Sequence, residues 1–391
     1  MRLLCLVRVN ATDAAGEVCN ENVAMGSFPE TGLGSLLPTP VNIACRCRKR
    51  TPNSNLKPQF MAKANLLLVA AALMIPVGVS AQTNSNLPVS RSAGLLRVTL
   101  PANQISLVAL PMVDRVVSNG TVSAVAGATL TLSDAALPGL VAAPHSIQFV
   151  SGAGLGARVR ISAATANSVT TAALIAGVAA GDQYMIVPDD TIAGIFGATN
   201  TAGLLGGSGA ASSDEVYIQT NGVLTGYFYK GSGLGGTGWR RTANPSGASE
   251  PNAPIDPLTG VYVIRKPGGN PVSLDITGYT VSGRQKPTVV SGFNILSNPF
   301  TLPTTLGKAN LKDFVTGGTG SASADIVYLE NGGVLTGYFY KSGGLGGTGW
   351  RRTDSPSGAD QSGVVLTPGK AILFKEQAGT AGFTLQEPFT E

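Results

Sequence analysis

The sequence predicts an all-β protein, with an N-terminal β domain followed by two tandem copies of a β-sandwich or barrel-like module. One stretch of 21 residues occurs twice, at 222–242 and at 333–353, and only two positions differ between the copies. Short segments with a hydrophobic period of two are separated by Gly, Pro and Asn, which is the pattern of strands and turns. The chain is 43% hydrophobic and 13% charged, so it can bury a core and must build its surface largely from Ser, Thr, Asn and Gly.

The first 81 residues are expected to lie outside this fold. Residues 61–81 have the layout of a secretory signal peptide: Lys63, then the apolar stretch Leu66–Val79, then small residues up to Ala81. The apolar stretch is shorter than the roughly 20 residues of a spanning helix, and a buried core helix is the alternative. Residues 1–60 then form a leader, which is either a mistranslated segment before a true start at Met61 or a genuine extension. Composition favours the first, and we expect this leader to be disordered or absent in the cell.

The positions of the cysteines and the balance of charge indicate where the mature chain is located and which partners it is not expected to have. All four cysteines lie in the leader, so the mature chain would be exported to an oxidising place without disulfides. Of the 27 basic and 22 acidic residues, eight and four precede residue 82, which leaves 19 and 18 in the remainder. Because this remainder is nearly neutral and has no basic stripe, a nucleic-acid partner is not expected.

Residues 82–187 are predicted to form the N-terminal β domain. Tight turns of Gly and Ala separate its segments, as at Ala126-Gly127-Ala128, where a hairpin is expected. Residues 167–180 are compatible with either helix or strand. The expected strands are 96–100, 105–110, 121–125, 129–132, 146–150, 157–161 and 184–187.

The two repeat modules are predicted at 188–283 and 284–391, with corresponding residues 111 positions apart in the duplicated stretch. Each is expected to begin with a short helix, at 191–196 and at 306–315. A tight hairpin is expected at Asn221-Gly222 and at Gly332-Gly333, because both pairs tolerate the positive φ angles of a type I′ turn. The remaining expected strands are 215–218, 223–229, 261–265, 272–276, 371–375 and 383–385.

The duplicated stretch also holds the candidate binding surface. Tyr227 and Tyr229 project from one face of a strand, and Trp239 opposite them would complete a platform of three rings. If exposed, the platform suits stacking on a sugar or contact with a protein. If buried, it forms a corner of the core with Arg against the rings, and this alternative stays open. The candidate residues are Tyr227, Tyr229, Trp239, Arg240 and Arg241, with Tyr338, Tyr340, Trp350, Arg351 and Arg352 in the second copy.

Residue types suited to catalysis are scarce. Gly233–Gly238 and Gly344–Gly349 match G-x-G-x-x-G, but a dinucleotide site needs a helix next, and Trp-Arg-Arg follows here. The one histidine, His145, is expected to be a turn residue, away from any nucleophile elbow. We therefore expect no catalytic residue, no cofactor and no metal ligand. Carboxylates far apart in the sequence leave a hydrolase as the weakest alternative.

Two pairs of segments resemble a family of uncharacterised secreted β-rich bacterial proteins. They are Ser146–Arg158 with Ile161–Asn167, and Tyr184–Pro188 with Thr191–Phe196. The resemblance covers residues 90 to 391 and implies export and a β fold. It implies no activity and no site residues.

Together these observations predict a secreted, non-catalytic structural or interaction protein of a bacterial cell surface or extracellular matrix, with the periplasm as a second location. The duplicated aromatic and arginine-bearing hairpin loops are expected to make its contacts. The expected partner is a polysaccharide or a protein surface, with self-association as a further option, and no membrane span is expected in the mature chain. A carbohydrate-binding protein or adhesin is the first alternative.

Overall fold

The structure is a computed structural model, which describes residues 6–12, 18–24, 92–133, 140, 143–220, 222–377 and 383–386. It confirms the all-β fold class, with 44% of the described residues in strands and 4% in helices. The chain divides into two compact units, Met1–Ser80 and Ala81–Glu391. In the first unit, β1 (Leu6–Thr12) pairs antiparallel with β2 (Val18–Ala24). The predicted signal peptide and the rest of the predicted leader lie outside the described residues.

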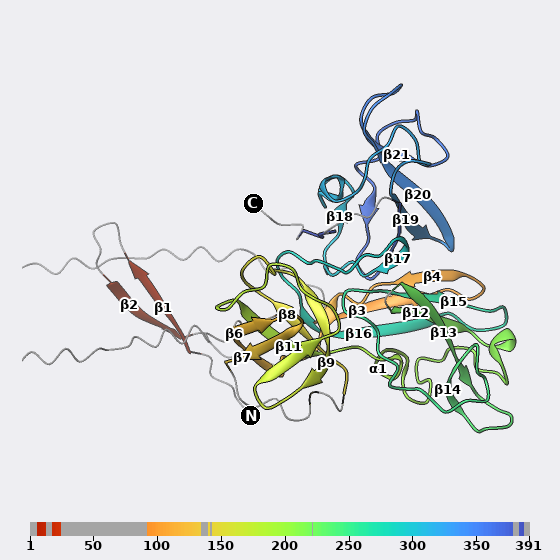
Figure 1. Ribbon diagram of the computed structural model, residues 1–391, viewed down its shortest axis with the longest axis horizontal. Helices are drawn as coiled ribbons and strands as arrows, with labels where there is room; N and C mark the ends of the chain where they lie inside the picture. Colours follow the sequence, from red (N-terminus) through yellow and green to blue (C-terminus); the bar gives the residue numbers. More distant parts are fainter. Residues whose placement is uncertain are drawn as a thin grey trace, which may run out of the picture. The chain divides into compact units, whose positions relative to one another are not determined.

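Six strands between Ser118 and Pro188 form a closed barrel (Figure 1). Its order is β10-β7-β6-β11-β8-β9, and side chains such as Phe149, Val169 and Ile186 fill its interior. The hairpin predicted across Ala126–Ala128 is confirmed, because β6 pairs with β7 around Gly127, whose φ is 64°. The strands are β6 (Ser118–Ala126), β7 (Thr129–Leu132), β8 (His145–Phe149), β9 (Arg158–Ala164), β10 (Ser168–Thr171) and β11 (Gln183–Pro188).

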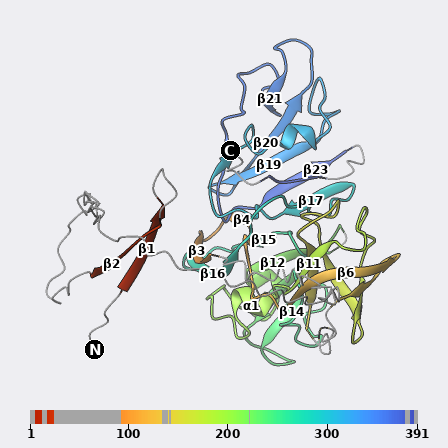
Figure 2. The ribbon, with the colours of Figure 1, turned by 90° about the vertical axis from the view of Figure 1, so that its left-hand side faces the viewer.

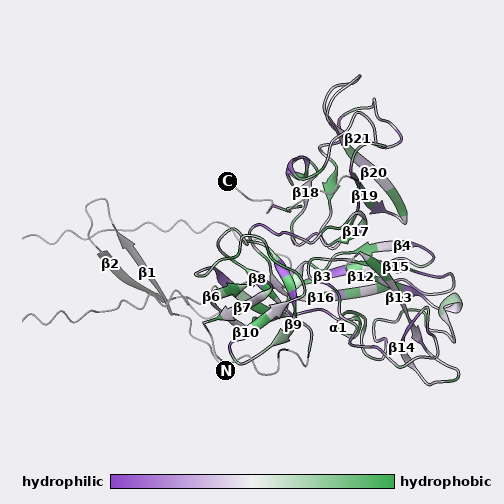
Figure 3. Ribbon diagram, viewed as in Figure 1, coloured by the Kyte–Doolittle hydropathy of each residue, from purple (hydrophilic) through white to green (hydrophobic). Residues whose placement is uncertain are grey.

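The first repeat module is a two-layer sandwich. A five-stranded sheet has the order β14-β13-β12-β15-β4, and a three-stranded sheet has the order β3-β16-β5. Residues of both sheets meet in one core, for example Val263 with Leu274, and hydrophobic residues lie along β4 and β15 (Figure 3). The strands are β3 (Ala93–Leu100), β4 (Ile105–Val108), β5 (Met112–Val113), β12 (Glu215–Thr220), β13 (Val223–Lys230), β14 (Gly238–Arg241), β15 (Val261–Ile264) and β16 (Val272–Thr280).

The second module repeats the five-stranded sheet in the order β17-β23-β19-β20-β21 (Figure 2). A two-stranded sheet, β18-β22, adds to it. A single bridge between Gln285 and Leu385 stands where β3 pairs with β16 in the first module. The strands are β17 (Gly292–Leu296), β18 (Thr304–Thr305), β19 (Ile326–Asn331), β20 (Val334–Lys341), β21 (Gly349–Arg352), β22 (Val365–Leu366) and β23 (Ile372–Glu376).

The described residues contain little helix. The predicted short helix is confirmed as α1 (Ile192–Phe196), whose first turn is capped by the hydroxyl of Thr191 accepting from the backbone N–H of Gly194. The helix predicted over 306–315 is wrong, since only the 3₁₀ turn η2 (Leu311–Asp313) forms there. Its buried leucines pack on the sheet from irregular backbone, so their spacing did not require a helix. A second 3₁₀ turn is η1 (Ala210–Ser212).

The barrel is an insertion within the first copy of the repeat. β4 and β17 occupy the same edge position in the two five-stranded sheets, and Pro111-Met112 matches Pro299-Phe300 after them. In the second copy the chain then runs directly to Thr305, which pairs with Val365. In the first copy it makes the whole barrel before it reaches the matching bridge from Thr191 to Pro254. The predicted N-terminal domain, 82–187, therefore divides between the barrel and the first sandwich.

The two modules meet by a reciprocal exchange of backbone hydrogen bonds. The edge strand β4 of the first module bonds to the loop before β23 of the second. In the same way, β17 of the second module bonds to the loop before β15 of the first. Such an exchange is the signature of a two-fold, isologous interface, here formed within one chain. The bonds are Gly260 N–H to Ile295 O (3.0 Å) and Ser297 N–H to Leu258 O (2.9 Å), matched by Ala371 N–H to Leu107 O (3.1 Å) and Ala109 N–H to Gly369 O (2.9 Å).

Candidate functional site

The duplicated stretch forms the two strands at one edge of each five-stranded sheet, β13 and β14 in the first module and β20 and β21 in the second. In the second copy, Gly332 and Gly333 have φ angles of 60° and 80°, as a type I′ turn requires. Gly222 has a φ of 82° in the first copy, while its neighbour Asn221 lies outside the described residues. The tight hairpin predicted between β19 and β20 is therefore confirmed. The turn sets the register of β19 against β20, and β20 pairs on its other side with β21, where Tyr340 lies opposite Trp350.

The predicted aromatic set comes together, but inside the core. Tyr229 lies directly opposite Trp239, with ring centroids 5.6 Å apart, and Tyr340 lies opposite Trp350 at 5.8 Å. The side chains of Trp239 and Trp350 are only 0% and 2% exposed. An exposed three-ring platform is thus ruled out, because the face that bears the rings is the core face of each sheet. Tyr227 and Tyr338 are buried with them, at 3% and 9% exposure.

The neighbouring arginines divide into two kinds. Arg240 and Arg351 are 4% and 5% exposed, so they are not available at a surface. Arg241 and Arg352 are exposed and pair with nearby carboxylates, Glu250 at 2.9 Å and Asp354 at 2.6 Å respectively. The candidate surface thus retains only these two arginines as fully exposed members, with Tyr229 and Tyr340 half-buried.

Buried cations hold the loops that follow. We call residues 231–237 the first Gly-rich loop and 342–348 the second. Lys230 donates to the carbonyls of Leu234 and Pro245, and Lys341 does the same to Leu345 and Pro356. The buried arginines donate to further loop carbonyls, Arg240 to Gly235 (2.9 Å) and Arg351 to Gly346 (2.8 Å).

The resulting loops have the same shape in both copies. Gly235 and Gly346 both have a φ of 92°, a conformation that a side chain disfavours. Each loop exposes one leucine almost completely, Leu234 at 94% and Leu345 at 91%. Neither these leucines nor the lysines that bond to their carbonyls were among the candidate residues predicted from the sequence. The signal for the lysines was their position, since each one ends the strand that the loop follows.

The G-x-G-x-x-G match does not have the surroundings of a dinucleotide site. The loops run directly into β14 and β21, which are edge strands of antiparallel sheets. A dinucleotide site requires the loop to open a helix, whose N-terminus faces the pyrophosphate. These glycines serve the tight path of the loop instead.

The two loops differ in the residue that lies beside the buried arginine. Arg351 pairs with Asp360 at 3.2 Å, and the matching position in the first copy is Ser249. Partial burial opposes ionisation of Asp360, but hydrogen bonds from Ser362 and from the Trp350 backbone, with the nearby Arg351, lower its pKa. It is therefore ionised at neutral pH. Among the described residues, no carboxylate forms an ion pair with Lys230, Arg240 or Lys341.

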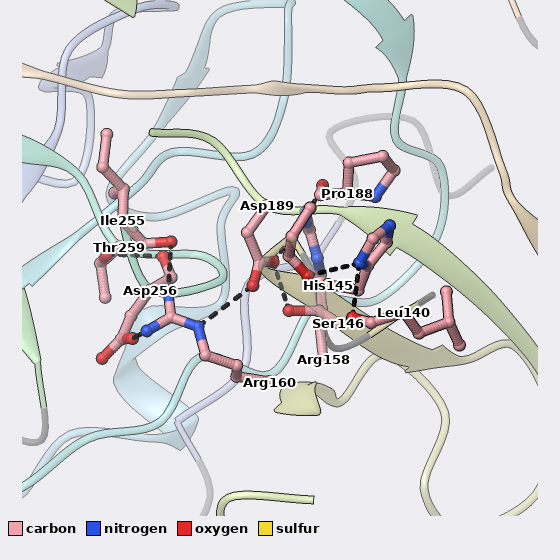
Figure 4. A network of polar contacts seen from close by, with 11 residues as sticks. Leu140, His145, Ser146, Arg158, Arg160, Pro188, Asp189, Ile255, Asp256 and Thr259 are labelled. Carbon is pink, nitrogen blue, oxygen red and sulfur yellow. Dashed lines mark hydrogen bonds and ion pairs between the residues drawn. The ribbon is translucent and has the colours of Figure 1, made fainter. Parts of the chain in front are cut away.

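A second polar cluster centres on Asp189, which is 6% exposed (Figure 4). Its carboxylate accepts from the hydroxyl of Ser146, from Arg158 at 3.3 Å and from Arg160 at 3.1 Å. Arg160 also pairs with Asp256 at 2.8 Å. Because Ser146 and both arginines lie on barrel strands, while Asp256 belongs to the first sandwich, Arg160 ties the inserted barrel to its host module.

This cluster contains Ser, His and Asp, but not in the order of a catalytic triad. The hydroxyl of Ser146 donates directly to Asp189. The Nδ1 of His145 lies 2.9 Å from the carbonyl of Leu140 and 2.7 Å from that of Ala143. In a triad the imidazole stands between the hydroxyl and the carboxylate. His145 instead holds the segment before β8 and is the first residue of that strand, where the sequence predicted a turn.

A small cavity of about 70 Å³ lies where the barrel, the first sheet and the segment 288–296 meet. Arg160, Gln219, Thr259 and Asn294 contribute to its lining. A water molecule occupies about 30 Å³ of liquid, and pockets for small ligands measure about 300–1,000 Å³. The cavity therefore fits a few waters and is too small for a sugar ring.

Two searches for other sites were negative within the described ranges. No group of three or more His, Cys, Asp or Glu side chains is placed to hold a metal ion there. Nor does any helix in those ranges have the length and hydrophobicity to cross a membrane.

Comparison of the chain with protein-family models, with curated proteins and with solved structures gives no match. The resemblance to secreted β-rich bacterial proteins stays a prediction. What the chain does is therefore inferred from its own two loops and from the architecture that presents them.

Proposed function

We propose that this protein is exported, performs no reaction, and makes contacts at a bacterial surface or in an extracellular matrix through its two Gly-rich loops. The observation that carries the proposal is the nearly complete exposure of Leu234 and Leu345 at the same point of both loops. This revises the contact surface expected from the sequence, because the aromatic rings are buried in the cores of the two modules.

The fold does not itself require these leucines. The glycines of the loops are explained by their positive φ angles. The leucines touch solvent, and a single exposed Leu is common in proteins. Here, however, the same Leu recurs, while the buried strand Val261–Ile264 and its counterpart Ile372–Lys375 share no residue at matching positions. The buried rings of the duplicated stretch recur as well, so the proposal rests on the exposure of the two leucines at the same point of both braced loops.

Both loops are braced before any partner arrives. A loop held in one conformation loses less entropy on binding than a mobile one, which raises affinity. Lys230 and Arg240 supply this support in the first copy, and Lys341 and Arg351 in the second. Two like loops on one chain also raise the effective concentration for a partner with repeated binding sites.

The test replaces the leucines and follows where the protein goes. Cells producing the wild type, and cells producing Leu234→Ser with Leu345→Ser, are separated into envelope, matrix and medium. We expect the wild type in the envelope or matrix and the double variant in the medium. N-terminal sequencing of the recovered protein checks export and cleavage after Ala81.

The chain offers a matched control in Val223→Ser with Val334→Ser. These valines are 66% and 64% exposed and begin β13 and β20, at the ends away from the Gly-rich loops. Their replacement is expected to leave retention unchanged. Equal retention of the leucine variant and the wild type would remove the proposal.

A further inference from the structure

Each Gly-rich loop lies over two buried positive charges. Lys230 is 5% exposed and Lys341 is 4% exposed, and the ammonium group of each donates hydrogen bonds to two backbone carbonyls. Arg240 and Arg351 are buried beside them, and the Nε of each lacks a hydrogen-bond partner. Charges taken out of water normally need a counter-charge as well as hydrogen bonds.

The counter-charge is present under one loop only. Asp360, which is exposed, lies 3.2 Å from Arg351 beside the second loop. Under the first loop, where Ser249 takes that place, the described residues supply no carboxylate to Lys230 or Arg240. Glu250 is nearby but already pairs with the exposed Arg241. The first loop therefore has the larger uncompensated positive charge.

The backbone of each loop turns a hydrogen-bond donor outward above these buried charges. A trans peptide places its N–H opposite its carbonyl, and the described chain has no cis peptide bonds. The carbonyl of Leu234 points in toward Lys230, so the N–H of Gly235 points out from the exposed loop. The N–H of Gly346 does the same above Lys341. An outward donor above buried cations favours an anion, as backbone anion sites generally do.

We infer that the first Gly-rich loop binds the oxyanion groups of an acidic polysaccharide, with the second loop as a weaker copy. The inference rests on the proposed function and names the chemistry that its loops recognise. A polymer with repeated anions suits a chain with two such loops, because one molecule can occupy both. Residues 82–391 are close to neutral, so general attraction of polyanions to the whole surface is small.

The test uses the purified full chain with polygalacturonate as the probe and dextran as its neutral counterpart, at low and at moderate salt. We expect binding to polygalacturonate that weakens with salt, and no binding to dextran. Equal binding to both polymers would overturn the inference. Binding to anionic lipid vesicles with the same affinity as to polygalacturonate would overturn the assignment to a polysaccharide.

Exchange of the residue that differs beside the buried arginine, Ser249 in the first copy and Asp360 in the second, provides matched variants. Ser249→Asp places the counter-charge under the first loop and is expected to weaken binding about fivefold at low salt. Asp360→Ser removes it from the second loop and is expected to strengthen binding by a similar factor. Ser249→Asn has the same shape as the aspartate without its charge, and is expected to bind as the wild type does. Thermal unfolding of each variant checks that the fold is intact, since both positions are exposed.

The outcomes separate this inference from the proposed function. If Ser249→Asp and Asp360→Ser both bind polygalacturonate as the wild type does, the anion inference fails. The serine replacements at Leu234 and Leu345 still decide retention at the surface independently. If retention is lost with the leucines while the charge variants change nothing, the loops make contacts, but not with anions.

Discussion

Gly260 and Ala371 face each other at the junction of the two modules, and a Cβ placed on Gly260 would lie 2.5 Å from the Cβ of Ala371. The two residues are counterparts in the repeat, each donating its N–H to the edge strand of the other module. A side chain at position 260 would therefore collide with Ala371 and also with the backbone carbonyl oxygen of Val108, 2.7 Å from the same Cβ. The restriction is steric, since Gly260 is not among the residues with positive φ.

This pairing predicts a swap. Gly260→Ala alone is expected to destabilise the protein by about 1–3 kcal/mol, because the new methyl overpacks the junction. Combining it with Ala371→Gly should restore only part of that loss, because the clash with the Ala371 methyl is relieved while the new methyl still lies 2.7 Å from the Val108 carbonyl oxygen. Denaturant unfolding of both single variants and the double variant measures the coupling. Additive losses in the double variant would contradict a two-fold junction.

The two tryptophans predict unequal costs for the same substitution. The Nε1 of Trp239 donates to the carbonyl of Gly197 at 2.9 Å, whereas the Nε1 of Trp350 is buried without a partner. Trp239→Phe should therefore destabilise the protein by about 1 kcal/mol more than Trp350→Phe, the value of one hydrogen bond. Urea unfolding monitored by circular dichroism gives both values. An equal loss at the two positions would show that the Gly197 bond contributes nothing.

The buried network predicts that the Asp189 carboxylate is needed as a charge. Asp189→Asn keeps the shape but leaves Arg158 and Arg160 without their shared partner, and the expected loss is about 3–5 kcal/mol. Asp275→Asn serves as the control, because its pair with Arg97 is exposed on both sides and should contribute little. Chemical denaturation compares the two variants. A loss at Asp189 no larger than at Asp275 would mean that the network is not needed for stability.

Asp190 predicts a pH dependence. Burial raises the pKa of its carboxyl to about 7, with Arg158 acting in the opposite direction and Asp114 and Asp189 adding to the rise. The unfolded chain loses this proton near pH 4 and the folded chain near pH 7, so this group makes stability fall as the pH rises between those values. Asp190→Asn should remove that part of the fall and should unfold at a higher temperature than the wild type at pH 8. Scanning calorimetry at pH 5 and pH 8 decides it, and unchanged pH dependence in the variant would argue against a raised pKa.

Local structure was predictable from the sequence, whereas partners distant in the chain were not. The β6–β7 hairpin and the Gly332-Gly333 turn follow from alternation and turn residues that lie next to each other. The pairing of β3 with β16 joins segments more than 170 positions apart, and a period of two carries no information about which strand is the neighbour. For this reason the first sandwich was assigned without its own β3, β4 and β5.

The same limit explains why the burial of the candidate aromatic residues could not be predicted from the sequence. The sequence shows that Tyr229 and Trp239 share a face, and the structure agrees. Whether that face is covered depends on α1, which brings Phe196 to within 5.9 Å of the indole ring from a segment before the hairpin. The lysines under the loops were equally hidden, because a cation beside glycines suggests a solvated turn until its carbonyl partners are known.

The insertion of the barrel has a practical consequence. Its two ends lie side by side, with the N–H of Val117 bonded to the carbonyl of Ile186, so the host sandwich accommodates a complete foreign domain between Met112 and Thr191. The second module keeps the short connection from Phe300 to Thr305 at the equivalent place. That connection is a natural acceptor for grafting a cargo domain with adjacent termini, leaving both leucine-tipped loops free on the same polypeptide.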